Sequence, residues 1–378
     1  MVSSRSIPSL SSALADEFRP VDLSLLLCIA NRSDSVSIDA AIASAWPRDT
    51  GKEYRMSAVH IGGFWGMLAL LGSLTSGCTD GGTAGMTTDG GGSDGSDGGG
   101  MVCSPEGAFD GAPVTAAAGQ WTWVDVPQAI CRNGTATGFA VRLNPASDKL
   151  MIYFQGGGAC FNSATCGSNP ASFGASDFAV AAALGGQRGV FNSSDASNPF
   201  RDWNIVFVPY CTGDVHSGSA TGVTVPGSGS PTNQQFVGYR NVGYFLKRIV
   251  PTFPSITKVL LTGSSAGGFG SMLNYHRIAQ AFCPRPVSLV NDAGPIFADA
   301  YLSPCLQKRW RQLWNFDVAL PSGCTGCIGQ DGGGFFNYER FLARTYPNQR
   351  LGLISATQDA TISYFFGFGQ NNCAGLDG

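Results

Sequence analysis

The most informative segment of the chain reads KVLLTGSSAGGFGSMLNYHRIAQAF and spans Lys258–Phe282. It begins with an apolar run typical of a strand, Lys258–Thr262, and ends in a helical pattern over Gly268–Phe282. Between them, GSSAG fits the motif G-x-S-x-G with Ser265 at its centre. This motif also arises by chance in chains rich in Gly and Ser, but a preceding strand and a following helix are the context that makes it meaningful. We therefore predict that Ser265 is a nucleophile on a sharp strand-to-helix turn.

Strand-like and helix-like runs alternate along the rest of the chain from about residue 102. Two early strands followed by strand–helix alternation predict an α/β fold with a mostly parallel, doubly wound sheet, flanking helices and an antiparallel edge. The further expected strands are Trp121–Val126, Gly138–Leu143, Lys149–Phe154, Asn204–Tyr210, Val287–Asn291 and Arg350–Ala356, and the further expected helices are Asn233–Val250 and a stretch near Tyr338–Thr345.

A second glycine-rich turn follows an earlier strand. The segment YFQGGGACF, Tyr153–Phe161, places three consecutive glycines where positive φ angles can aim N–H groups into a pocket. Such donors would stabilise the oxyanion formed when a serine attacks a carbonyl, together with the N–H of Ala266, the residue after the nucleophile. The alternative is a tight loop with no chemical role.

Composition excludes several classes of protein. The 378 residues carry a net charge of −3, which provides no basic surface for nucleic acid. An apolar content of 43% argues against a wholly disordered chain. The Ser265 motif matches neither a dinucleotide-binding fingerprint nor a phosphate-binding loop, so we expect no nucleotide cofactor.

The N-terminal region has the features of an export signal and a tether. Residues 56–78 contain an apolar run that ends in Ser-Gly-Cys78, which resembles a bacterial lipoprotein cleavage site and makes Cys78 a candidate for lipidation. Ordinary cleavage with free secretion, or a short membrane span, are the alternatives. Residues 79–101 are rich in Gly and Asp and are expected to form a disordered tether. Residues 1–55 precede the signal and are expected not to be native.

Four motifs carry a resemblance to a known family. They are GGGACFNSATC (Gly156–Cys166), PYCTGDVHSG (Pro209–Gly218), LLTGSSAGG (Leu260–Gly268) and VNDAGPIF (Val290–Phe297). In this order they resemble the pectin acetylesterase/Notum family of α/β-hydrolase-fold carboxylesterases, over roughly residues 103–378. The resemblance implies that Ser265 is the nucleophile and that Gly157, Gly158 and Ala266 donate to the oxyanion. It also implies a bacterial member of the family.

The acid of the catalytic triad should follow a late strand. Asp359 comes after the expected strand Arg350–Ala356 and matches the position of the acid in the family. Its role would be to orient a histidine and stabilise the imidazolium. Asp292 also follows a strand and is the rival, and the resemblance favours a structural role near the site for it.

The general base is the missing element in this arrangement. Histidine is the usual base near neutral pH, and the chain contains only His60, His216 and His276. His60 lies in the signal, and His276 lies on the helix after the nucleophile, facing away from the site. We expect the hydrolase domain, residues 102–378, to lack its C-terminal end, and the catalytic histidine to be missing with it. His216, as a pocket residue or an alternative base, remains the other interpretation.

The cysteines suggest an exported, disulfide-bonded protein. Ten cysteines follow Cys78, and an even number in an exported chain predicts disulfides. The resemblance implies two pairs, Cys160 with Cys166 and Cys131 with Cys211. We expect the two cysteines of the CTGC segment, residues 324–327, to form a loop disulfide, and Cys373 to lack its partner if the chain is truncated.

These observations predict an exported serine carboxylesterase, either a bacterial surface lipoprotein or a secreted protein. It would hydrolyse acetyl or other acyl esters of a small molecule or polysaccharide through an acyl-enzyme, as a monomer, without a metal or an organic cofactor. Attachment to the membrane would be through a lipid on Cys78. Two alternatives remain open: a carboxylesterase for lipid or acyl-protein esters, and a catalytically inactive surface protein that binds a ligand in the same pocket.

Overall fold

The computed structural model describes residues 103–185 and 188–377 of the chain. The expectations for residues 1–55, for the signal 56–78 with Cys78, and for the tether 79–101 lie outside these residues. None of the helices within the described ranges is long and apolar enough to cross a membrane.

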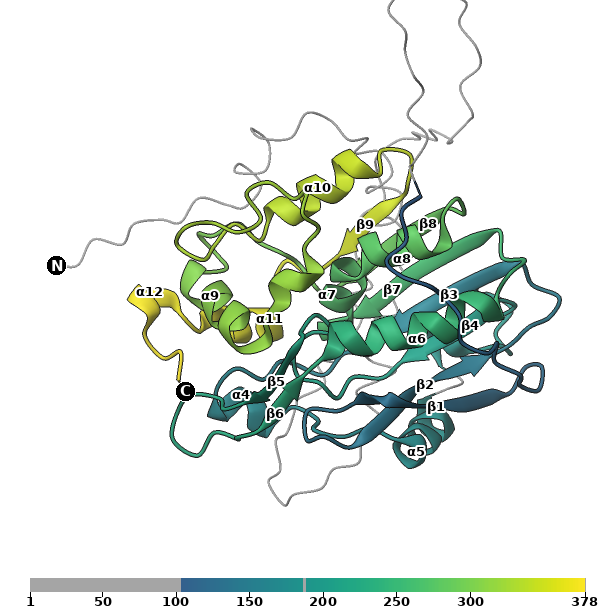
Figure 1. The fold of residues 1–378 in the computed structure, drawn as a ribbon, viewed down its shortest axis with the longest axis horizontal. Helices are drawn as coiled ribbons and strands as arrows, with labels where there is room; N and C mark the ends of the chain where they lie inside the picture. The colour runs from purple at the N-terminus through teal and green to yellow at the C-terminus, as the bar shows by residue number, and fades with distance from the viewer. Residues whose placement is uncertain (1–102, 186–187, 378) are drawn as a thin grey trace, which may run out of the picture. The chain divides into compact units, whose positions relative to one another are not determined.

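Seven strands form the central sheet, in the order β1-β2-β4-β3-β7-β8-β9 (Figure 1). The strands from β4 to β9 in this order run parallel, whereas β1 pairs antiparallel with β2 and β2 antiparallel with β4. The mostly parallel sheet with an antiparallel edge is therefore confirmed, and the chain has an α/β-hydrolase fold. The strands are β1 Trp121–Ile130, β2 Ala136–Arg142, β3 Lys149–Phe154, β4 Asn204–Val208, β7 Lys258–Ser264, β8 Val287–Asp292 and β9 Leu351–Ile354.

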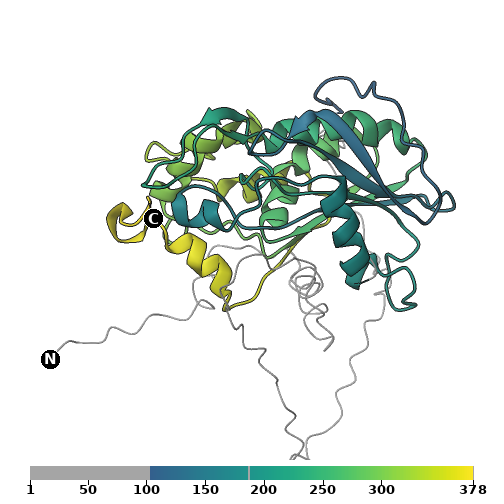
Figure 2. The ribbon, with the colours of Figure 1, turned by 90° about the horizontal axis from the view of Figure 1, so that it is seen from below.

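Helices cover both faces of this sheet. Successive residues of β2 point to opposite faces, as expected for a strand. Phe139 packs on Phe245 of α6 with 5.4 Å between ring centroids, whereas Ala140 belongs to a core cluster that contains Phe178 of α5. Figure 2 shows α5 on the face of the sheet opposite α6. The helices are α4 Ser163–Gly167, α5 Ala175–Gly185, α6 Gly238–Thr252, α7 Ala266–Leu273, α8 Tyr275–Phe282, α9 Pro304–Trp314, α10 Asn337–Thr345, α11 Ala360–Gly367 and α12 Gln370–Cys373, with short 3-10 turns at Gly189–Phe191 and Phe316–Ala319.

The central strand β3 explains where the site lies. Its sequence KLMIYF is buried at every position after Lys149, as expected for a parallel strand that is covered on both faces. β3 pairs with β7 from Lys149 opposite Lys258 to Phe154 opposite Gly263. The two glycine-rich turns therefore leave the sheet at the carboxyl ends of adjacent parallel strands, which is where such sheets place their ligand sites.

The structure corrects two helix boundaries. The predicted helix Asn233–Val250 begins only at Gly238, because residues Gln234–Phe236 form strand β6, which pairs with β5, Ala220–Val223. The main chain of this segment is also held by Arg132, whose carbonyl accepts from the N–H of Gln235. Tertiary hydrogen bonds thus override the helical spacing of the apolar residues.

The second correction concerns the helix after Ser265. The predicted helix Gly268–Phe282 is two helices, α7 and α8, which meet at Asn274. The Asn274 amide donates to the carbonyls of Gly270 and His216 at 2.9 and 3.0 Å. An asparagine that bonds to the preceding turn in this way competes with the regular helical pattern.

Candidate active site

Ser265 lies on the sharp turn between β7 and α7. Its backbone has φ 55° and ψ −121°, a conformation that costs energy in a residue with a Cβ atom. Its N–H donates to the carbonyl of Asp292 at 2.8 Å, which anchors the turn to the end of β8. The side chain of Ser265 is partly exposed, while the residues on either side are buried. The fold thus holds one serine in a strained turn and leaves it accessible.

Glycines around Ser265 allow the turn to pack closely on its neighbours. A Cβ atom on Gly263 would lie 2.6 Å from the carbonyl oxygen of Phe154, and one on Gly268 would lie 2.6 Å from that of Asp292. These contacts are with backbone atoms, so they cannot be relieved by a side-chain rotation. Gly263 of the motif and Gly268 just after it are therefore needed for the approach of the turn to β3 and β8.

The turn Gly156–Gly158 lies directly against the serine turn. A Cβ atom on Gly156 would lie 2.5 Å from the carbonyl oxygen of Ser264 and 3.3 Å from the Cβ of Ser265. Gly158 has φ 75°, in the left-handed region. Within residues 103–185 and 188–377, the N–H groups of Gly157, Gly158 and Ala266 have no hydrogen-bond acceptor. The structure thus brings together the serine and three unpaired donors of the kind an oxyanion requires.

The two candidate carboxylates occupy different positions. Asp359 is the N-cap of α11, where its Oδ1 accepts from the N–H of Ile362 at 2.9 Å, and it is partly exposed. Asp292 is the last residue of β8 and lies opposite Ser264 in the strand register. Helix α11 also reaches the glycine turn through its residue Phe365. A Cβ atom on Gly158 would lie 3.1 Å from the Cζ of that ring. Asp359 therefore begins a helix that adjoins the site.

His216 is buried beside β3 and engaged in a hydrogen bond. Its Nε2 lies 2.8 Å from the carbonyl oxygen of Gln155, and its ring packs edge-on against Phe154 at 5.0 Å between centroids. Burial lowers the pKa of His216 to about 4, although the hydrogen bond to Gln155 acts in the opposite direction. A carbonyl oxygen can only accept, so the neutral ring carries its proton on Nε2. The nitrogen that faces Gln155 is thus a donor.

His276 lies on α8 and is engaged elsewhere. Its Nδ1 is 2.8 Å from the hydroxyl of Tyr346, and burial lowers its pKa. His60 lies outside the described residues. Both described histidines thus have hydrogen-bond partners other than Ser265.

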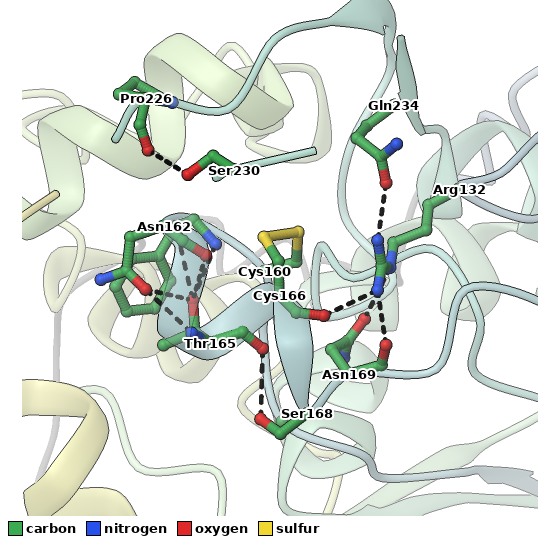
Figure 3. The surroundings of a disulfide bond; sticks show 12 residues. Arg132, Cys160, Asn162, Thr165, Cys166, Ser168, Asn169, Pro226, Ser230 and Gln234 are labelled. Carbon is green, nitrogen blue, oxygen red and sulfur yellow. Dashed lines mark hydrogen bonds between the residues drawn. A yellow bond between two sulfur atoms is a disulfide. The ribbon is translucent and has the colours of Figure 1, made fainter. Parts of the chain in front are cut away.

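The segment after the glycine turn is fastened by a disulfide and a buried arginine. Cys160 is bonded to Cys166 across helix α4, and Asn162 caps that helix with its side chain (Figure 3). The guanidinium of Arg132 donates to Asn169, to Gln234 and to two further carbonyls of this loop. Sequence reasoning did not identify Arg132 or Asn169, since an arginine at the end of a strand carries no motif.

All ten described cysteines are paired. Both pairs implied by the resemblance are present, Cys160 with Cys166 and Cys131 with Cys211, and the CTGC segment holds its own disulfide. Cys373 is bonded to Cys305, so the expectation that it lacks a partner is wrong. The short helix α12, which contains Cys373, lies against α9, which contains Cys305. Cys103 is bonded to Cys283.

In the described part of the chain, no group of three or more His, Cys, Asp or Glu residues is arranged to hold a metal ion.

Comparison with known proteins gives a consistent result. A family model described as Pectinacetylesterase matches residues 115–329, more than half of the chain. The chain is 32% identical over 217 residues to the palmitoleoyl-protein carboxylesterase notum2 of Xenopus laevis, a match that covers 51% of this chain and 42% of the relative. It is 30% identical over 164 residues to the palmitoleoyl-protein carboxylesterase NOTUM of Homo sapiens, covering 40% of this chain and 30% of the relative. Each match thus spans less than half the length of the relative.

Among solved structures, the Wnt deacylase Notum from Drosophila aligns with this chain with 20% sequence identity and a TM-score of 0.47. That alignment covers 67% of this chain and 75% of the Notum chain.

Proposed function

Because the chain belongs to the pectinacetylesterase family, we propose that it is a serine carboxylesterase whose nucleophile is Ser265. The observation that carries the proposal is the strained turn of Ser265, packed against a glycine turn with unpaired N–H donors. An accessible serine at this point of an α/β sheet is suited to attack an ester carbonyl.

The reaction proceeds in two steps. The Ser265 oxygen bonds to the ester carbonyl carbon while its proton passes to a general base, and the carbonyl oxygen becomes an oxyanion. The N–H groups of Gly157, Gly158 and Ala266 stabilise that oxyanion. The tetrahedral intermediate then expels the alcohol, which takes the proton from the base, and leaves an acyl-enzyme. Water hydrolyses the acyl-enzyme by the same sequence and regenerates the serine.

We propose that Asp359 orients the general base and that Asp292 supports the serine turn through its main chain. Neither described histidine is the base in this scheme. His216 donates its Nε2 proton to Gln155, and His276 is bonded to Tyr346. A chain with these histidines alone should therefore turn over esters slowly, at the rate that the oxyanion donors sustain without a base.

The proposed substrates are acetyl esters, by analogy with the family name. A second candidate, hydrolysis of longer acyl esters, is favoured by the similarity to palmitoleoyl-protein carboxylesterases. We also propose that the protein is exported, with Cys78 as a lipid attachment point. The five disulfides support export, because disulfides persist in oxidising compartments.

The test is ester hydrolysis by the full chain with 4-nitrophenyl acetate and 4-nitrophenyl octanoate. Ser265→Ala should abolish acylation, seen as the initial release of 4-nitrophenol and as acyl-enzyme by mass spectrometry, with both esters, whereas Ser197→Ala, at an exposed loop serine, should leave it unchanged. The ratio of the two rates assigns the acyl class. Equal acylation of Ser265→Ala and the parent chain would refute the nucleophile, and no acylation of either would favour a ligand-binding protein without catalysis.

A further inference from the structure

Three carbonyl groups of the segment Gln155–Gly158 each accept a hydrogen bond from a buried side chain. His216 donates to the carbonyl of Gln155 at 2.8 Å, and the Asn169 amide donates to that of Gly157 at 2.7 Å. The hydroxyl of Tyr210 donates to the carbonyl of Gly158 at 2.9 Å. Because all three donors come from outside the turn, the turn is held by its surroundings and not by hydrogen bonds of its own.

The bond from Asn169 has a specific consequence for the oxyanion donors. The carbonyl of Gly157 and the N–H of Gly158 belong to one planar trans peptide, so they point in opposite directions. A hydrogen bond that fixes the Gly157 oxygen therefore fixes the direction of the Gly158 N–H. Glycine has the widest choice of backbone conformations, so this direction would otherwise be poorly defined.

Asn169 is itself oriented by a buried cation. The Nε of Arg132 donates to Oδ1 of Asn169 at 3.2 Å, and its Nη2 donates to the Asn169 carbonyl at 2.5 Å. Since the Asn169 Oδ1 accepts from Arg132, its Nδ2 is the atom that faces Gly157. Figure 3 shows the guanidinium of Arg132 directed at Asn169 and at the carbonyl of Cys166, which is in the disulfide-bonded loop. Both side chains are buried, at 6% exposure for Arg132 and 5% for Asn169. Bonds from a charged donor in a buried setting are stronger than neutral ones.

We propose that Asn169, held by Arg132, is a positioning residue that aims the Gly158 N–H at the oxyanion. This inference rests on the proposed function, because it assigns Gly158 as an oxyanion donor. Asn169 itself does not touch the reacting atoms. Its contribution is made only when the oxyanion forms, so it should affect kcat and leave KM unchanged.

The test variant is Asn169→Asp, which preserves the shape of the side chain. It keeps the oxygen that accepts from Arg132 and replaces the Nδ2 donor with an oxygen that faces the Gly157 carbonyl. The matched control is Asn198→Asp in the loop before β4. Asn198 is also buried, at 8% exposure against 5% for Asn169, and its Nδ2 donates to the carbonyls of Val190 and Asn192. The two variants thus lose the same kind of donor, one at the glycine turn and one remote from it.

Two measurements decide the proposal. The first is the rate of Ser265 labelling by a fluorophosphonate, together with kcat and KM for 4-nitrophenyl acetate. Removing an oxyanion donor costs about 100- to 1,000-fold in rate, so misdirecting one should slow Asn169→Asp by about 10- to 100-fold in kcat. Asn198→Asp should be unchanged. The second is 15N relaxation of the Gly157 and Gly158 amides, which should become more mobile in Asn169→Asp only.

The outcomes separate this inference from the proposed function. Unlabelled Ser265 in the parent chain would refute the proposed function, while the relaxation measurement would still show whether Asn169 orders the turn. Unchanged amide order and rate in Asn169→Asp, or equal slowing in both variants, would overturn the positioning role. If Asn169→Asp does not fold, Asn169→Ser removes the same donor without adding a charge and is judged by the same measurements.

Discussion

Gly158→Ala is the sharpest single test of the glycine turn. Gly158 has φ 75°, and an alanine in the left-handed region costs about 1–2 kcal/mol of the free energy of folding. The added Cβ would also lie 3.1 Å from the Cζ of Phe365, so the ring of Phe365 or the turn must move by a few tenths of an ångström. Because alanine disfavours φ 75° and meets Phe365, we expect the turn to relax, so that the N–H of residue 158 leaves its position.

The matched control is Gly134→Ala in the turn between β1 and β2. Gly134 has φ 89°, and a Cβ atom there would meet nothing within 4 Å. Both variants should therefore lose about 1–2 kcal/mol of stability for the left-handed backbone, measured by urea denaturation, and Gly158→Ala should lose more because of its contact with Phe365. Only Gly158→Ala should lose ester hydrolysis, by about 100-fold if one oxyanion donor is displaced.

The assay is initial-rate hydrolysis of 4-nitrophenyl acetate, with the melting temperature measured on the same samples. If Gly158→Ala and Gly134→Ala lose activity equally, the loss follows stability and the glycine turn has no chemical role. If Gly158→Ala is destabilised but fully active, the assignment of the Gly158 N–H as a donor is wrong.

Two further predictions concern the supports of the turn. The disulfide between Cys160 and Cys166 closes a short loop and contributes about 2 kcal/mol of stability if it acts by restricting the unfolded chain. Replacing both cysteines by serine should therefore lower the melting temperature and the rate at which a fluorophosphonate labels Ser265. An unchanged labelling rate would show that the disulfide does not position the turn. Burial lowers the pKa of His216 in the folded chain to about 4, below its usual value of 6.5. The unfolded chain therefore binds the extra proton, and stability is lost as the pH falls from 6.5 towards 4. The difference in unfolding free energy between the parent chain and His216→Gln should therefore shrink over this pH range, at up to about 1.4 kcal/mol per pH unit, and a difference independent of pH would show that His216 is not buried in its neutral form.

The sequence predicted the elements whose signal is local. Strand β3 was expected at Lys149–Phe154 and has those bounds, because a continuous apolar run is what a buried parallel strand requires. The turn at Ser265 lies between a strand and a helix as expected, because its glycines are dictated by close backbone contacts. Both features depend on residues that are adjacent in the chain.

The features that depend on distant residues were not predictable. The helical spacing predicts the start of α6 five residues early, because the pairing of Gln234–Phe236 with β5 is a tertiary interaction. The partner of Cys373 lies 68 residues away and follows from the packing of α12 on α9. The bond from Asn169 to Gly157 and that from Arg132 to Asn169 join loops with no shared motif.

Labelling of the full chain with a fluorophosphonate, followed by peptide mapping, shows whether Ser265 is the nucleophile. We expect the phosphonyl group on Ser265, a faster reaction of the folded protein than of the urea-unfolded chain, and no labelling of Ser265→Ala. Labelling at another residue, or a rate at Ser265 equal to that of the unfolded chain, would show that the fold does not make Ser265 a nucleophile.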